Sequence, residues 1–252
     1  MSAGRERKEP DVPPPEGDPK PGPEPASAEG EVGADGATMR WSPAADHAEI
    51  EAKYREGREL AEAGKLREAA EAYAEVLERD PGHLKARNNL GYVYDRLGES
   101  ERALREYRAA LELDPENERL LSNIGALLGA LGRFEEAEAE LRRALVLSPH
   151  SPDAHLNLGL VLFRKGYYPG ATAELERAIA LEPECESAFY YLGEALNRLG
   201  RTEEALVALE KAVELRPENG RAYYTLGILY DRLQQPERAA SMYRRASEHA
   251  GS

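Results

Sequence analysis

Cysteine is almost absent from this 252-residue chain, in which Cys185 is the only one. A single thiol excludes an intrachain disulfide framework and any metal site built from several thiolates. Long hydrophobic runs are also missing, and no stretch approaches the roughly 20 apolar residues that a membrane span needs. The first residues carry Arg5, Arg7 and Lys8, then acidic residues and proline, so they lack the apolar core of a secretory signal. We therefore expect a cytoplasmic protein without membrane insertion.

Basic residues are in the minority, with 33 Lys and Arg against 47 Asp and Glu and a formal net charge of −14. Nucleic-acid binding depends on neutralising phosphates with cations, so this balance argues against a nucleic-acid partner. Catalytic motifs are missing too. The five histidines form no H-E-x-x-H pair, and the glycines form no phosphate-binding loop. The sequence predicts neither an enzyme nor a cofactor or metal site.

Large aliphatic residues are scarce in the first 47 residues, which hold 9 of the 17 prolines and ten acidic residues. Such a stretch cannot bury enough apolar surface to offset its conformational entropy. We predict a disordered, acidic, proline-rich tail over residues 1–42. A helix should begin near Pro43, because Ser42 and Pro43 suit an N-cap and a first helical position.

The rest of the chain has a period of 34 residues. Glycine recurs at 57, 91, 125, 159, 193 and 227, and alanine at 69, 103, 137, 171, 205 and 239. Proline recurs at 81, 115, 149, 183 and 217, and a second glycine at 64, 98, 132, 166 and 200, where the sixth unit has Gln234. Four residue classes on one period indicate an internal repeat. In each unit the second glycine ends one helix and the proline follows another, which predicts an all-α array of helical hairpins.

This pattern resembles the tetratricopeptide repeat (TPR) family over residues 50–252. The run Asn89-Leu90-Gly91-x-x-Tyr94, followed by Ala103, Tyr107, Ala110 and Pro115, is similar to the family signature of leucine, glycine, tyrosine, alanine, aromatic, alanine and proline. We assign residues 43–252 to the solenoid, with six repeats at 50–83, 84–117, 118–151, 152–185, 186–219 and 220–252. The resemblance implies a right-handed superhelical solenoid of six helix-turn-helix units, whose first helices line a concave groove.

We expect a protein or peptide partner to bind in this groove. Repeat positions 2, 5, 6, 9, 12 and 13 share one face of the first helix and carry nine Lys and Arg against six Asp and Glu. The predicted ligand is therefore an extended or helical acidic segment of a partner protein. The candidate contact residues are Asn89, Asn123 and Asn157; Arg96, Arg164, Arg198 and Arg232; Tyr190, Tyr191 and Tyr224; and Leu156, Leu160 and Phe163.

Each group of candidates has two interpretations. Stacked asparagines can pair with the amides of an extended peptide, as in the similar O-linked N-acetylglucosamine transferases of the family, or they can pack between helices. The arginines can grip carboxylates or phosphates, or they can form a solvated rim. The tyrosines, leucines and phenylalanine can form an anchor pocket beside the small residues of repeat 3, or belong to the core. A carboxylate clamp of the kind that binds chaperone tails is not expected, because only its central asparagine, Asn89, is present.

The terminal repeats depart from the pattern. Repeat 1 carries Lys53 and Glu56, with Glu56 in the place of Leu90, as a terminal unit facing water requires. No further amphipathic helix covers repeat 6, so Met242, Tyr243 and Ala246 can leave an apolar edge for a homodimer contact. The tail is either an inert linker or a weak inhibitor in the groove, and in the second case deleting residues 1–42 raises partner affinity, most at low salt.

The function expected from these observations is a non-catalytic adaptor, scaffold or assembly factor. The alternative is a regulatory or substrate-targeting subunit of a separate enzyme.

Overall fold

The computed structural model describes residues 43–249, with side chains from residue 46 onward. The tail predicted over residues 1–42 lies outside the described residues. Between residues 43 and 249 the chain forms helices and no strand. The helices are α1 (Pro43–Glu62), α2 (Leu66–Arg79), α3 (Leu84–Arg96), α4 (Ser100–Leu113), α5 (Glu118–Ala130), α6 (Phe134–Leu147), α7 (Pro152–Arg164), α8 (Tyr168–Leu181), α9 (Glu186–Arg198), α10 (Thr202–Leu215), α11 (Gly220–Arg232) and α12 (Pro236–Glu248).

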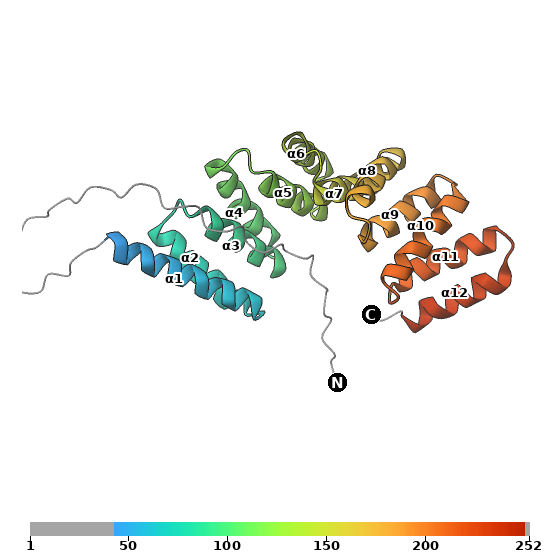
Figure 1. Cartoon of the computed structure of the whole chain (residues 1–252), viewed down its shortest axis with the longest axis horizontal. Coiled ribbons are helices and arrows are strands. Elements are labelled where there is room, and N and C mark those ends of the chain that lie inside the picture. Colours follow the sequence, from blue (N-terminus) through green and yellow to red (C-terminus); the bar gives the residue numbers. More distant parts are fainter. Residues whose placement is uncertain (1–42, 250–252) are drawn as a thin grey trace, which may run out of the picture. The chain divides into compact units, whose positions relative to one another are not determined.

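The helices form six hairpins that stack in the order of the sequence (Figure 1). The second helix of each hairpin packs against its own partner and against the first helix of the next hairpin. The described hairpins make up one compact unit. The predicted all-α solenoid of six helix-turn-helix units is confirmed.

The junctions between hairpins are not equally extensive. Fewer residues meet where α4 packs on α5 and where α10 packs on α11 than at the α2–α3, α6–α7 and α8–α9 junctions. The first helices of neighbouring repeats also contact one another. The contact between α5 and α7 is more extensive than the contact of α7 with α9 or of α9 with α11. Repeats 3, 4 and 5 are therefore joined more closely to one another than to the repeats on either side.

Glycine packs the two helices of each hairpin together. A Cβ atom added to Gly91 in α3 would lie 2.8 Å from the Tyr107 ring in α4, closer than real Cβ atoms approach. The recurring alanine of the second helix, Ala103 in this hairpin, is fully buried. The period-34 glycine therefore stands in mid-helix despite its low helix propensity, because a tyrosine ring or a leucine side chain of the second helix occupies the space of its missing side chain.

The second recurring glycine ends the first helix in a left-handed conformation. Gly98, for example, has a φ of 76°, and the following residue, Glu99, donates its backbone N–H to the Tyr94 carbonyl at 2.8 Å. In the sixth hairpin the same conformation falls on Gln234, with a φ of 55°. Gln234 is the one non-glycine residue with positive φ among residues 43–249. A residue with a Cβ atom is strained at positive φ, so the turn of the last hairpin is less favourable than the glycine turns of the others.

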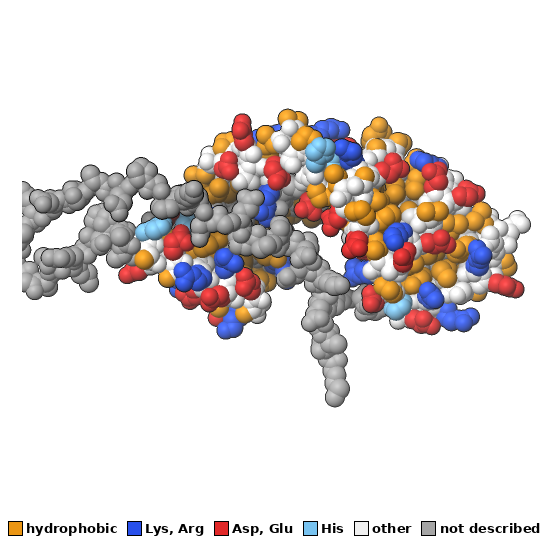
Figure 2. Space-filling model, in the orientation of Figure 1, with side chains coloured by type: hydrophobic (Ala, Val, Ile, Leu, Met, Phe, Trp, Pro, Cys, Tyr) orange, Lys and Arg blue, Asp and Glu red, His pale blue; other side chains and the backbone are white. Residues whose placement is uncertain are grey.

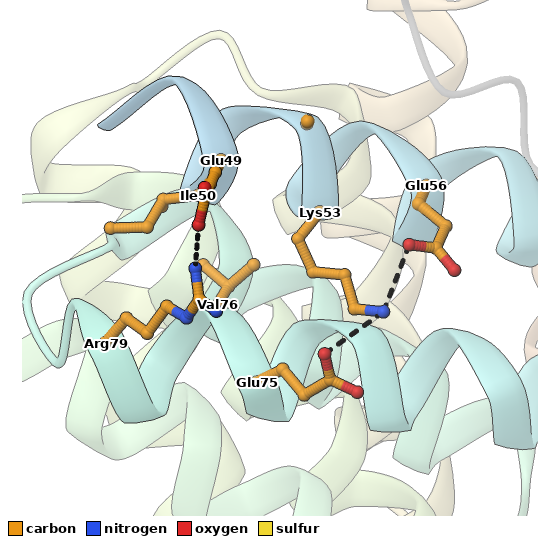
Figure 3. A pocket seen from close by; sticks show the side chains of 8 residues that line it. Glu49, Ile50, Lys53, Glu56, Glu75, Val76 and Arg79 are labelled. Atoms are coloured by element: carbon orange, nitrogen blue, oxygen red, sulfur yellow. Dashed lines mark hydrogen bonds and ion pairs between the residues drawn. The ribbon is translucent and has the colours of Figure 1, made fainter. Parts of the chain in front are cut away.

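The outer edge of the first hairpin is polar. Figure 3 shows Lys53 of α1 reaching between two carboxylates, with its Nζ 3.1 Å from Glu56 and 3.0 Å from Glu75 of α2. A second ion pair joins Arg79 to Glu49 at 2.9 Å. These side chains line a shallow cavity of about 340 Å³ with no histidine or cysteine in its wall. The edge that would otherwise stack on a preceding repeat is thus covered by satisfied charges.

The outer edge of α12 also differs from the edges that stack. The second helices carry an aliphatic residue, half-buried against the core, where α12 has Ser247. The hydroxyl of Ser247 donates to the Arg244 carbonyl at 2.7 Å. Met242, Tyr243 and Ala246, which the sequence places at an apolar edge, are half-buried and pack against the core. Self-association through α12 stays a prediction.

Candidate functional site

The candidate residues lie on one face of the first helices, which we call the first-helix face and define by repeat positions 2, 5, 6, 9, 12 and 13. None of the thirteen candidates is fully buried. The four arginines, Asn123 and Tyr224 are exposed, and the others are half-buried. Each of them therefore presents some surface to solvent.

The three asparagines, although one repeat apart, have different surroundings. Asn89 donates its Nδ2 protons to the hydroxyls of Tyr54 in α1 at 3.2 Å and of Tyr73 in α2 at 3.3 Å. Burial raises the pKa of Tyr73 to about 12, so its phenol stays neutral near neutral pH. Asn123 and Asn157, by contrast, have no side-chain hydrogen-bond partner among the described residues. Asn89 thus ties its helix to the first hairpin, while the other two amides are open.

The four arginines also divide into two pairs. Arg96 donates to the Tyr92 hydroxyl at 2.8 Å, and Arg232 donates to Oδ1 of Asn197 at 2.6 Å. Arg164 and Arg198 are exposed and have no partner among residues 46–249. The open cations lie at the ends of α7 and α9, the first helices of repeats 4 and 5.

Four aromatic rings gather between these two helices, and we call them the aromatic cluster: Phe163, Tyr168, Tyr190 and Tyr191. The Phe163 ring lies 5.6 Å from the rings of Tyr168 and Tyr191, and Tyr190 lies 5.1 Å from Tyr191, centroid to centroid. The edge-to-face arrangement is the favourable one for aromatic pairs. All four side chains are half-buried, so the cluster is partly exposed to solvent. Burial, with the nearby Glu194 carboxylate, raises the pKa of Tyr190 to about 12.

Sequence reasoning missed Tyr168, which lies on the second helix of its hairpin, outside the positions taken as the groove. Its signal was available, because Phe134 one repeat earlier also places an aromatic ring at this position. Leu156 and Leu160 pack half-buried against the core beside the cluster. Tyr224 lies apart from it, 57% exposed, with its ring 5.7 Å from Tyr243 of α12.

The small residues of repeat 3 do not simply leave a recess, as the sequence had indicated. A Cβ atom on Gly129 of α5 would lie 2.9 Å from a methyl group of Val161 in α7. Gly129 and Ser122 are buried. The expected pocket is therefore partly filled, because the small side chains allow α7 to approach α5 closely.

Charged and hydrophobic side chains are interspersed over the rest of the surface. Figure 2 shows hydrophobic side chains gathered over α9–α11 on the face drawn, with acidic and basic groups scattered among them.

No helix in residues 43–249 combines the length and the hydrophobicity needed to cross a membrane. The described residues also contain no group of three or more His, Cys, Asp or Glu side chains able to hold a metal ion. Burial raises the pKa of the Cys185 thiol, which disfavours the reactive thiolate.

Protein-family models match the repeats of this chain. Models of the tetratricopeptide repeat match residues 54–118, 152–185 and 184–251, and a TPR repeat model matches residues 128–166. Among curated proteins, none matches the chain.

Solved structures with the same fold include PilF of Pseudomonas aeruginosa, which is 25% identical, with a TM-score of 0.72 over 82% of this chain and 95% of that one. YrrB, described as a TPR protein with an unusual peptide-binding site, is 27% identical, with a TM-score of 0.58 over 71% of this chain and 93% of that one. MamA is 28% identical, with a TM-score of 0.58 over 64% of this chain and 94% of that one.

Proposed function

Because the chain belongs to the tetratricopeptide repeat family, we propose that it is a non-catalytic protein-interaction module that serves as an adaptor or scaffold. Its first-helix face binds an extended or helical segment of a partner protein. The observation that carries this proposal is the set of open polar groups on that face, the side-chain amides of Asn123 and Asn157 and the guanidinium groups of Arg164 and Arg198.

An open asparagine amide suits a backbone ligand. Each side chain offers a donor and an acceptor, as a peptide group does, so it can pair with a peptide without reading its side chains. The amides of Asn123 and Asn157 are not needed by the fold, because neither makes a hydrogen bond within the described chain. YrrB, at 27% identity, is described as having a peptide-binding site, which supports a ligand of this class.

The charge of the face favours an acidic segment. Lys and Arg outnumber Asp and Glu on the first-helix face, although the whole chain has a net charge of −14. Two of its acidic groups are already engaged, since Glu194 accepts from Thr225 at 2.6 Å and Asp231 accepts from Tyr243 at 2.7 Å. In repeats 4 and 5 the guanidinium groups of Arg164 and Arg198 have no partner among the described residues. A guanidinium group can bind a carboxylate through two hydrogen bonds.

The proposal is tested by photo-crosslinking in a lysate of the source cells. A benzophenone amino acid is placed at Ala130, exposed on the first-helix face, or at Val207, 69% exposed on α10. We expect a specific partner to crosslink from position 130 and not from position 207. The Asn123→Ala/Asn157→Ala variant should lose most of that crosslink. A partner that crosslinks only from position 207 would contradict the proposal, and a single stoichiometric enzyme as partner would favour the alternative role of a targeting subunit.

A further inference from the structure

Among the candidate asparagines and arginines, the open ones lie in the middle of the array. Asn89 and Arg96 in repeat 2 and Arg232 in repeat 6 are bonded to neighbouring side chains. Asn123, Asn157, Arg164 and Arg198, in repeats 3 to 5, make no such contact within the described chain. A ligand that binds through these four groups would thus lie along repeats 3 to 5.

The aromatic cluster and the two open arginines share helices α7 and α9. Phe163 directly precedes Arg164 in the last turn of α7. Tyr191 and Arg198 are seven residues apart in α9, which places them on one stripe of the helix about 10 Å apart along its axis. An extended peptide covers this distance in about three residues.

We propose that repeats 4 and 5 form an anchor site for a short acidic segment. The segment places a phenylalanine, tyrosine, tryptophan or leucine side chain on the aromatic cluster and a carboxylate two to four residues away on Arg164 or Arg198. This inference rests on the proposed function and adds to it the composition and spacing of the ligand. Half-buried rings gain contact area from such an anchor, and the two guanidinium groups supply the complementary charge.

A structural role for the arginines makes a different prediction. A cation in the last turn of a helix stabilises the negative end of the helix dipole, and Arg96, Arg164, Arg198 and Arg232 all occupy this place. In that role the four arginines are equivalent, and substituting them changes stability but not the choice of ligand. Binding measurements on folded variants separate the two roles.

The test is a selection from a random dodecapeptide library displayed on phage, with the full-length chain as bait. Enriched peptides are synthesised with a fluorophore, and their affinities are measured by anisotropy. We expect an aromatic residue or leucine with Asp or Glu two to four residues away. Affinity should fall about tenfold in Arg164→Glu/Arg198→Glu, in which two attractive contacts become repulsive.

Two controls accompany the selection. Arg119→Glu reverses an exposed, unpartnered charge in the first turn of α5, in repeat 3 and outside the proposed anchor site, and should leave affinity within about twofold. Replacing the aromatic residue of the selected peptide by alanine tests the anchor without altering the protein, and should also cost about tenfold. Circular dichroism melts establish that each variant is folded.

Three results would overturn the inference: peptides without the acidic and apolar pair, equal sensitivity to Arg119→Glu and Arg164→Glu/Arg198→Glu, or no enriched peptide at all. The proposed function depends on the separate crosslinking result. A partner crosslinked from position 130 but indifferent to the two arginines would leave the proposed function standing while this anchor site fails.

Discussion

His155 in α7 and Arg87 in α3, two repeats apart, make equivalent contacts, each within its own repeat. Arg87 donates from Nη1 to the carboxylate of Glu106 at 3.1 Å and from Nη2 to the Pro81 carbonyl at 2.8 Å. These contacts tie the first helix of the repeat to its second helix and to the preceding proline loop. The side chain of Arg87 is only 19% exposed.

The imidazole of His155 makes the corresponding contacts with two nitrogen atoms. Its Nδ1 lies 2.7 Å from the Glu174 carboxylate and its Nε2 lies 3.1 Å from the Pro149 carbonyl. The two ring nitrogens of His155 thus occupy the places that Nη1 and Nη2 of Arg87 take in repeat 2.

The first prediction concerns the Arg87–Glu106 pair. Arg87→Leu should lower the free energy of unfolding by about 2 kcal/mol, because it leaves Glu106 and the Pro81 carbonyl without their partner. Adding Glu106→Ala should restore most of the loss, because the pair is then replaced by apolar groups, as in repeat 5, where Phe189 and Ala208 stand at these positions. Arg87 Nε is buried without a partner, and this replacement also removes it.

Urea denaturation of the two single variants and the double variant measures this coupling. Additive losses would contradict the prediction. His155→Arg, the matched replacement in repeat 4, should unfold within about 0.5 kcal/mol of the unaltered protein.

The second prediction separates the three asparagines. Asn89→Ala should lower the free energy of unfolding by about 1 kcal/mol, because the hydroxyls of Tyr54 and Tyr73 lose their common donor. Asn123→Ala and Asn157→Ala should change it by less than about 0.5 kcal/mol, because their amides have no partner among the described residues. Thermal and urea melts of the three variants make the comparison. Equal losses at the three positions would contradict this prediction and would indicate that all three asparagines stabilise the packing of the helices in the same way.

The third prediction concerns tyrosine ionisation. The pKa values of Tyr73 and Tyr190 are raised to about 12, mainly by burial, whereas a tyrosine in the unfolded chain has its ordinary pKa of about 10. Protonated phenols therefore stabilise the fold fully below pH 10, and this contribution is lost as the pH rises towards 12. Absorbance at 295 nm should show a late phase of phenolate formation, and Tyr190→Phe should reduce its amplitude. Ionisation of all tyrosines near pH 10 in the folded chain would refute the assignment.

The fourth prediction concerns the turn between α11 and α12. Gln234→Gly should raise the free energy of unfolding by about 1 kcal/mol, because glycine adopts a φ of 55° without the strain of a Cβ atom. The reverse substitution, Gly200→Gln at the same turn of repeat 5, should lower it by a similar amount. Denaturant melts check both signs, and two changes of the same sign would be inconsistent with this explanation.

The sequence predicts the backbone better than the side-chain contacts, because the two depend on different information. A period of 34 with glycine and proline at fixed offsets determines where helices begin and end, which is why the hairpins were predictable, and the Ser42-Pro43 pair predicted the start of α1. Hydrogen bonds depend on residues that do not repeat. Asn89 meets the phenols of Tyr54 and Tyr73, whereas the same places around Asn157 hold Ser122 and Leu141.

The aromatic cluster was only partly predictable for a similar reason. Phe163 and Tyr191 share the first-helix face, but Tyr168 reaches them from the second helix of its hairpin. A helical wheel compares residues within one helix and does not show this approach. The close packing of Gly129 on Val161 likewise joins two repeats, and depends on the distance between helices that the repeat period does not specify.

The unequal junctions between hairpins have a consequence for how the array comes apart. In a linear array each repeat is stabilised by its own contacts and by those with its immediate neighbours, so unfolding can stop at a weak boundary. The α4–α5 and α10–α11 junctions are the less extensive ones, and they enclose repeats 3 to 5. Under mild destabilisation the outer hairpins can open while this central block keeps its amide protons protected from exchange. Repeats 3 to 5 would then both bind the peptide and resist unfolding. The outer hairpins could unfold without releasing the ligand.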